Sequence, residues 1–428
     1  MSGTYRFKTR ASLITVGLCV LGSFVLPAIA GESGNWSQWR GPNRDGSIAS
    51  AEWPSSLGEE ALHEQWSASL AEGYASPVLT DDKVFTVGTR DKKEEVIRAF
   101  DRKTGKQLWE HVSPGAMKVP FFANKNGSWA RSTPATDGDF LYVLSMVDVM
   151  SCLDVDSGEV KWQDDFKERE GTELPSFGGV SSPLIDGEFV YIQGGSAAAK
   201  LNRDSSENVW RALEDRRAMF GSAFSSPVIA TLHGVRQIVV QTRSTLGGID
   251  PESGEVLWST PVEAFRGMNI LTPVISGNRV FTATYGGGSF LFEIEKTGEG
   301  DAMFPKLKWR QKKIEGYMSS AVIVGGHIYH HARNKKLYCL DLETGEPAWI
   351  SDRKIGDYCS MVVNGDRVLA LNQDGTLVLF EASPEAFTIV DERKVSDEST
   401  WAHLAVSGDQ VFVRGLKQLT AFGWGTKN

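Results

Sequence analysis

The chain has 428 residues and a formal net charge of −9 at pH 7, with 41% hydrophobic and 23% charged residues. An acidic chain of this kind lacks the clustered Lys and Arg that neutralise phosphates, so we expect no nucleic-acid partner. Beyond the N-terminal thirty residues, no stretch is apolar and long enough to span a bilayer. These features favour a globular protein beyond residue 30.

Residues 1–30 have the pattern of a secretory signal peptide. Arg6, Lys8 and Arg10 precede an apolar run that ends in a small-x-small sequence at 28–30. A retained membrane anchor is the alternative, because the run nearly reaches spanning length. Cleavage removes three basic and no acidic residues and leaves a net charge of −12. We therefore expect an exported protein, periplasmic or extracellular, that is monomeric and has no transmembrane segment after cleavage.

Residues 31–61 contain Trp36, Trp39 and Trp53 among Gly and Pro residues, without a regular apolar period. Aromatic side chains of this size need a surface on which to be buried. We therefore expect an irregular N-terminal arm that packs on the domain formed by residues 62–428.

One phrase recurs eight times along residues 62–428. It consists of a short apolar run, a turn pair such as Asp-Gly or Ser-Gly, and an alternating run of β-branched and aromatic residues, which predicts a β-hairpin. The copies occupy 76–88, 133–145, 182–194, 226–242, 272–284, 320–332, 360–372 and 403–415.

A second phrase follows most copies of the first and predicts the other two strands of each unit. It reads "IRAFDRKTGKQLW" at 97–109, and looser copies keep the final tryptophan; the eighth, near 386–395, has none. Two hairpins per unit form a four-stranded antiparallel sheet. Because the hairpin copies are spaced 40 to 57 residues apart, the pattern predicts a β-propeller.

The ends of the chain predict how the ring closes. Trp66 has no hairpin before it, and the last hairpin lacks an outer strand, so we expect the strand at 64–70 to complete the last blade and cover its open edge. The fold class is thus all-β, an eight-bladed propeller. We expect the recurring tryptophans to wedge between neighbouring blades, each contributing roughly 2–3 kcal/mol: Trp66, Trp109, Trp162, Trp210, Trp258, Trp309 and Trp349.

The second phrase resembles the blade motif of the PQQ-like repeat propellers, carried here by Ala99, Asp101, Thr104, Gly105 and Trp109. That family includes the quinoprotein alcohol dehydrogenases and a periplasmic lipoprotein that assists outer-membrane protein assembly. The resemblance covers about 62–428 and implies the fold more than an activity. The dehydrogenase branch implies an adjacent-cysteine pair and carboxylate and amide ligands for Ca²⁺, but this chain has no adjacent cysteines, and no catalytic residue can be carried over.

The residues just before each innermost strand should ring the mouth of the central channel. They are rich in aromatics and include one cation, which suits stacking of a planar ligand or contact with a partner's side chain; the alternative is that they only fill the channel. These candidates are Tyr74, Trp129, Arg131, Val180, Phe224, Asn269, Tyr317, Tyr358 and Trp401.

No metal site is predicted. His330 and His331 lie in a predicted strand and point to opposite faces, so we expect one structural and one exposed histidine. Cys152, Cys339 and Cys359 are expected to fill core positions.

These observations lead us to expect an exported, non-catalytic propeller without a cofactor, which acts as a binding scaffold for a protein or a polysaccharide. Two alternatives stay open. One is a PQQ- and Ca²⁺-dependent alcohol or sugar dehydrogenase with a divergent site, and the other is a carbohydrate-binding propeller.

Overall fold

The computed structural model describes residues 1, 3, 35–50, 52–121, 127–215, 224–298 and 302–425. The chain divides into two units, residues 1–31 and 32–428, and the second is described below. Apart from Met1 and Gly3, the predicted signal peptide lies outside the described residues. Among the described helices, none has the length and apolar character needed to cross a bilayer.

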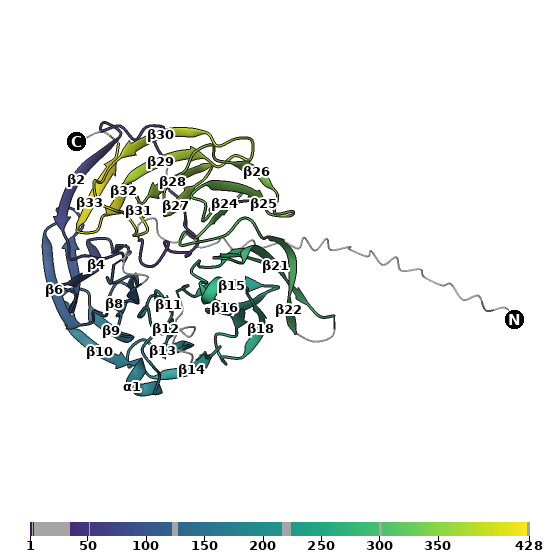
Figure 1. Ribbon diagram of the computed structural model, residues 1–428. Coiled ribbons are helices and arrows are strands. Elements are labelled where there is room, and N and C mark those ends of the chain that lie inside the picture. The colour runs from purple at the N-terminus through teal and green to yellow at the C-terminus, as the bar shows by residue number, and fades with distance from the viewer. Residues whose placement is uncertain are drawn as a thin grey trace. The chain divides into compact units, whose positions relative to one another are not determined.

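The described strands of residues 32–428 form eight sheets arranged as the blades of a ring, with antiparallel pairing throughout except at one short N-terminal strand, which confirms the predicted fold class (Figure 1). Each blade runs from an inner strand to an outer strand in chain order. The first four blades contain β3 (Val78–Leu79), β4 (Lys83–Arg90), β5 (Glu94–Asp101) and β6 (Gln107–Pro114); β7 (Ala135–Thr136), β8 (Phe140–Leu144), β9 (Val149–Asp154) and β10 (Val160–Asp165); β11 (Leu184–Asp186), β12 (Phe189–Gly194), β13 (Ala197–Asn202) and β14 (Asn208–Ala212); and β15 (Val228–Leu232), β16 (Val235–Gln241), β17 (Thr245–Ile249) and β18 (Val256–Pro261).

The other four blades follow the same plan, with a strand from the N-terminal part of the chain added to each of the last two. They contain β19 (Val274–Ser276), β20 (Arg279–Thr284), β21 (Gly288–Lys296) and β22 (Met303–Gln311); β23 (Val322–Val324), β24 (His327–His331), β25 (Leu337–Asp341) and β26 (Pro347–Ile350); β27 (Cys359–Asn364), β28 (Arg367–Asn372), β29 (Thr376–Glu381), β30 (Ile389–Lys394) and, beside β27, β1 (Ser47–Ile48); and β31 (Ala405–Ser407), β32 (Gln410–Arg414), β33 (Gln418–Trp424) and β2 (Leu62–Ser69). The described helices are α1 (Phe166–Glu170) and the 3₁₀ turn η2 (Phe265–Gly267).

The ring closes as predicted, because β2 pairs antiparallel with β33. The register runs from Leu62 opposite Trp424 to Ser69 opposite Gln418. In Figure 1 the purple β2 lies along the yellow β33 at the outer side of the eighth blade. The N-terminal strand therefore covers an edge that would otherwise be open.

The recurring tryptophans lie at the contacts between blades. In six of the seven, the indole N–H donates to a backbone carbonyl of the next blade at 2.7–3.0 Å, as in Trp66 to Arg102 and Trp109 to Val155. Trp258 differs, since its N–H donates to the Gln237 side chain of its own blade at 2.5 Å, while the ring belongs to the hydrophobic cluster between β15–β18 and β19–β22. Each indole thus joins apolar packing to one hydrogen bond.

A belt of hydroxyl groups links the blades around the axis. The Ser or Thr that precedes the inner strand of one blade accepts a hydrogen bond from a backbone N–H of the blade before it. The pairs include Ser76 to Thr133 at 2.9 Å, Thr133 to Ser182 at 3.0 Å and Ser182 to Ser226 at 2.9 Å. His403 N–H donates back to the Ser76 hydroxyl at 2.8 Å, joining the last blade to the first. This explains why the first phrase begins with a hydroxyl residue in most copies.

His330 and His331 are both buried, at 0% and 1% exposed, so the expectation that one of them is exposed was wrong. A blade in a ring is covered on both faces by its neighbours, and alternation along an inner strand therefore does not lead to solvent. His331 contacts the Ser319 hydroxyl and the Gly356 carbonyl, both at 3.0 Å. Cys152, Cys339 and Cys359 are buried free thiols.

Residues 36–48, which we call the axial segment, run through the middle of the ring. Leu79 N–H donates to the Trp36 carbonyl and Thr136 N–H donates to the Ser37 carbonyl, both at 2.9 Å. β1 pairs in parallel with β27, and the Trp36 ring stacks on His403 with centroids 6.0 Å apart. The segment therefore contacts blades on several sides of the axis.

Two buried arginines tie the axial segment to nearly opposite blades. Arg40 donates to the carbonyls of Asp45 at 2.8 Å and Ala321 at 2.5 Å. Arg44 donates to the carbonyls of Pro183 at 2.7 Å and Ser182 at 3.0 Å. Burial lowers the pKa of Arg40 to about 10 and that of Arg44 to about 9, and both remain protonated at neutral pH. These guanidinium groups satisfy carbonyls that the inner strands leave unpaired.

Candidate binding site at the propeller axis

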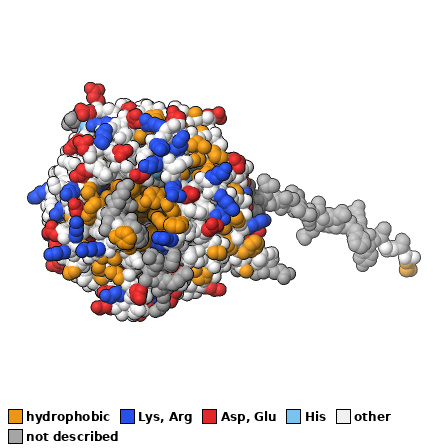
Figure 2. Space-filling model, in the orientation of Figure 1, with side chains coloured by type: hydrophobic (Ala, Val, Ile, Leu, Met, Phe, Trp, Pro, Cys, Tyr) orange, Lys and Arg blue, Asp and Glu red, His pale blue; other side chains and the backbone are white. Residues whose placement is uncertain are grey.

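A hollow of about 330 Å³, which we call the cup, lies at the axis beside the N-terminal ends of the inner strands. Its position follows from its lining, because the loops that lead into all eight blades contribute residues to it. Among the described residues the lining consists of Trp39, Tyr74, Arg131, Phe177, Val180, Ser182, Phe224, Ser226, Phe265, Arg266, Met268, Ile270, Thr272, Tyr317, Met318, Ser320, Tyr358 and Trp401. Figure 2 shows hydrophobic side chains gathered around a hollow near the middle of one face, with Lys and Arg side chains close by.

Most of the residues predicted from the sequence to ring the channel mouth come together in the cup. They are Tyr74, Arg131, Val180, Phe224, Tyr317, Tyr358 and Trp401. Trp129 and Asn269 are not part of the described lining. Trp129 lies behind Tyr74, edge-on at 5.2 Å between centroids, and its N–H donates to Glu72 at 3.0 Å.

One wall of the cup is a connected row of aromatic rings from the first, seventh and eighth blades. Trp401 lies 6.0 Å from Tyr74 and stacks on Tyr358 at 5.7 Å and 25°. Burial raises the pKa of Tyr74 to about 12 and also raises that of Tyr358. Both phenols therefore stay neutral, and this wall is an uncharged aromatic surface.

The facing wall is organised around the buried Arg243. Its guanidinium lies over the ring of Phe224 at 4.7 Å and over that of Phe177 at 5.7 Å, and it donates to the Arg266 carbonyl. The Asn269 amide donates to the Arg243 carbonyl at 2.9 Å. Asn269 is fully buried and thus supports this wall from behind, instead of standing on the rim.

The floor of the cup is formed in part by the axial segment. Trp39 lines the cup, and its indole N–H donates to the Thr272 hydroxyl at 3.1 Å. Further along the inner strands, a second hollow of about 430 Å³ lies between residues 38–45 of the axial segment and strands β11, β15 and β19. The axial segment therefore contributes to both hollows.

The charge in the described lining of the cup is positive. Arg131 and Arg266 contribute guanidinium groups, and no Asp or Glu is present among the lining residues. Arg131 donates to the Gly127 carbonyl at 2.6 Å, and burial lowers its pKa. Such a group favours an anion that replaces the water it has lost.

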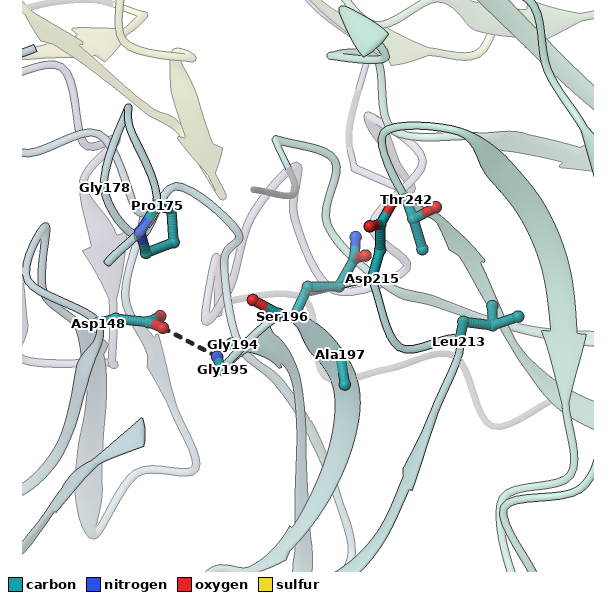
Figure 3. Close-up of a pocket in the computed structure, with 12 residues that line it drawn as sticks. Asp148, Pro175, Gly178, Gly194, Gly195, Ser196, Ala197, Leu213, Asp215 and Thr242 are labelled. Atoms are coloured by element: carbon teal, nitrogen blue, oxygen red, sulfur yellow. Dashed lines mark hydrogen bonds between the residues drawn. The ribbon is translucent and has the colours of Figure 1, made fainter. Parts of the chain in front are cut away.

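A crevice between blades two, three and four is too small for a ligand (Figure 3). It has about 20 Å³ of room, which is about what one water molecule needs. Asp148 accepts a hydrogen bond from Gly195 N–H at 2.9 Å, and burial raises the pKa of this carboxyl to about 6. We assign this crevice a structural part only.

Several lining residues were not predicted from the sequence, namely Trp39, Phe177, Phe265, Arg266, Met268 and Met318. Trp39 was expected in the N-terminal arm, whose path over the propeller the sequence did not indicate. The others lie near the chosen positions in the same loops, so a wider window before each inner strand would have included them. Nothing in the sequence indicates which residues of such a loop turn toward the axis.

The lining residues do not fit a Ca²⁺-bound quinone. Ca²⁺ takes six to eight oxygen ligands, in which carboxylates are prominent, and the described lining offers hydroxyls and carbonyls without any carboxylate. Elsewhere in the described part of the chain, no three His, Cys, Asp or Glu residues are grouped as metal ligands would be.

Known proteins resemble this chain in sequence. The model of the family described as "Outer membrane protein assembly factor BamB" matches residues 92–351. The BamB of Yersinia pestis is 22% identical over 331 residues, which cover 74% of this chain and 70% of that protein. The BamB of Moranella endobia is also 22% identical, over 68% of this chain and 74% of that protein.

Solved structures share the fold at low identity. BamB from Moraxella catarrhalis has a TM-score of 0.61 at 13% identity and covers 86% of this chain and 99% of its own. The quinohemoprotein alcohol dehydrogenase from Comamonas testosteroni has a TM-score of 0.64 at 12% identity, over 94% of this chain and 82% of its own. The fold is thus common to enzymes and to an assembly factor. Because the family model matches more than half of the chain, the chain belongs to the PQQ-like propeller family described as the outer membrane protein assembly factor BamB.

Proposed function

We propose that this protein is an exported, non-catalytic scaffold that binds a partner protein in the cup. The observation that carries the proposal is the lining: aromatic side chains and two arginines, drawn from all eight blades and the axial segment, converge on one hollow. Aromatic and Arg residues in a central, well-packed pocket are those that dominate protein interfaces. Export to the periplasm or the exterior rests on the signal pattern of residues 1–30.

The relatives support the same class of function. Their printed name is that of an assembly factor for outer membrane proteins, and such a factor works through contacts with other proteins. The rigid ring supports it too, since a preformed site loses little conformational entropy when a partner binds.

The dehydrogenase alternative has less support, because the described lining lacks carboxylates that could hold Ca²⁺ beside a quinone. A calorimetric titration with PQQ, with and without Ca²⁺, tests it separately. Micromolar binding that requires Ca²⁺ would favour the dehydrogenase over the scaffold. A carbohydrate-binding propeller is the other alternative, and glycan arrays test it.

Filling the cup tests the proposal directly. Val180 lines the cup and is partly exposed within it, so Val180→Trp places a large ring in the hollow without opening the core. Immobilised protein should retain a protein from an envelope extract of the host, and Val180→Trp should lose it. The matched control is Val209→Trp on β14, where the side chain is 46% exposed on an outer strand.

The control should retain the partner as the unchanged protein does. Thermal unfolding of both variants checks that each is folded. Retention of the same proteins by Val180→Trp and the unchanged protein would overturn the proposal that the cup is the binding site.

A further inference from the structure

The two arginines of the cup lack an acidic partner in the described part of the chain. Neither Arg131 nor Arg266 forms an ion pair with a described carboxylate, whereas Arg98 on β5 pairs with Glu110 on β6 at 2.7 Å. The protein as a whole has a formal net charge of −9. The cup is therefore a positive, apolar region in an acidic molecule, and its charge is complementary to an anion.

Arg266 is held in place by its surroundings. It has a left-handed backbone conformation, with φ of 52°, within the turn Phe265–Gly267. The buried Arg243 side chain donates to its carbonyl, and the Arg266 guanidinium lies over the half-exposed ring of Phe265 at 5.1 Å. A non-glycine residue keeps such a conformation only where its neighbours over-determine it, so this turn presents a cation and a ring together.

The Ser and Thr hydroxyls of the cup already accept hydrogen bonds within the belt, which leaves less of their hydrogen-bonding capacity for a sugar. Ser182, Ser226, Thr272 and Ser320 line it, and each of them accepts a backbone hydrogen bond within the belt. A glycan would need many free hydrogen-bonding groups, whereas an aromatic side chain needs an apolar surface and ring edges. The lining supplies an apolar surface and ring edges.

Resting on the proposed function, we propose that the cup recognises a segment of the partner protein in which an aromatic side chain lies next to Asp or Glu. The ring enters the hollow against Tyr74 and Trp401, and the neighbouring carboxylate pairs with Arg131 or Arg266. Burial of the ring supplies most of the affinity, and the charge-assisted hydrogen bonds select acidic neighbours over basic ones.

Selection from a random peptide library displayed on phage tests the motif without knowledge of the partner. Full-length protein should enrich peptides with an aromatic residue beside Asp or Glu. Arg266→Glu, at an exposed position, should shift the enriched neighbours toward Lys and Arg. Lys306→Gln, which removes a positive charge from an exposed side chain on β22, should enrich the same motif as the unchanged protein.

An enriched peptide then provides a quantitative probe. Its affinity should fall about ten- to hundredfold with Arg131→Gln combined with Arg266→Gln, the range expected for losing hydrogen bonds to a charged group. Enrichment of peptides without acidic residues, or an affinity that ignores both arginines, would overturn the inference. If Val180→Trp still abolishes such binding, the cup remains the site and only the acidic motif is wrong.

Discussion

The glycine of the second phrase is where a single methyl group should disturb the contact between two blades. Gly158 lies in the turn between β9 and β10 and has a φ of 74°, and the indole of Trp109 from the preceding blade covers it. A Cβ at this position would be 2.6 Å from one ring carbon and 2.7 Å from another. The indole is also fixed by its hydrogen bond to the Val155 carbonyl at 2.8 Å, so it cannot move freely.

Gly158→Ala should therefore destabilise the protein in two ways. A left-handed conformation costs Ala about 1–2 kcal/mol relative to Gly, and displacing a packed ring costs about 1–3 kcal/mol more. Gly234, in the turn between β15 and β16, is a matched control, since its φ is 78° and nothing lies within 4 Å of an added Cβ. Gly234→Ala should show only the cost of the left-handed conformation.

Equilibrium unfolding in urea, followed by tryptophan fluorescence, measures the difference in unfolding free energy. Gly158→Ala should lose about 1–3 kcal/mol more than Gly234→Ala. In a Trp109→Ala background the extra loss should vanish, because the ring that clashes is gone. Equal losses at the two glycines, or an extra loss that persists without Trp109, would refute the blade contact described here.

Two further changes test the buried polar groups. Thr133→Val removes the hydroxyl that accepts from Ser76 N–H and should cost about 1–3 kcal/mol of unfolding free energy, whereas Thr133→Ser should cost less. His330 is fully buried, and burial lowers its pKa from 6.5 to about 3, so below pH 6.5 only the unfolded form binds a proton and stability falls as the pH drops toward 3. As the pH is lowered from 8 to 5, the unchanged protein should therefore lose about 2 kcal/mol of unfolding free energy that His330→Leu keeps. A difference in unfolding free energy between the two proteins that stays constant across that range would contradict a buried neutral histidine.

Much of the ring was predictable because the strand signals are local. Alternation and turn pairs mark each hairpin, and the unmatched Trp66 strand indicated the closure onto the last blade. The eight copies of the hairpin phrase, together with this closure, predicted the number of blades. The same register explains why the positions before each inner strand, from Tyr74 to Trp401, meet at one mouth.

The course of the axial segment was not predictable, because its contacts exist only once the ring is formed. Arg40 and Arg44 donate to carbonyls of blades far away in sequence, and no period or motif encodes such partners. Asn269 was expected on the rim, but its amide donates to the Arg243 carbonyl behind the wall. This contact, too, exists only once the ring is formed. For His330 and His331, strand alternation gave the wrong exposure because neighbouring blades cover both faces.

The measurement that tests the central claim most directly is site-specific photo-crosslinking in living cells. A photo-reactive phenylalanine analogue in place of Tyr317 lies in the lining of the cup, and the same residue in place of Val209 lies exposed on an outer strand. The account predicts a covalent adduct with a partner protein from position 317 that disappears when Val180→Trp fills the cup, and no such adduct from position 209. Adducts that form at position 209 and not at 317, or that survive the filled cup, would contradict it.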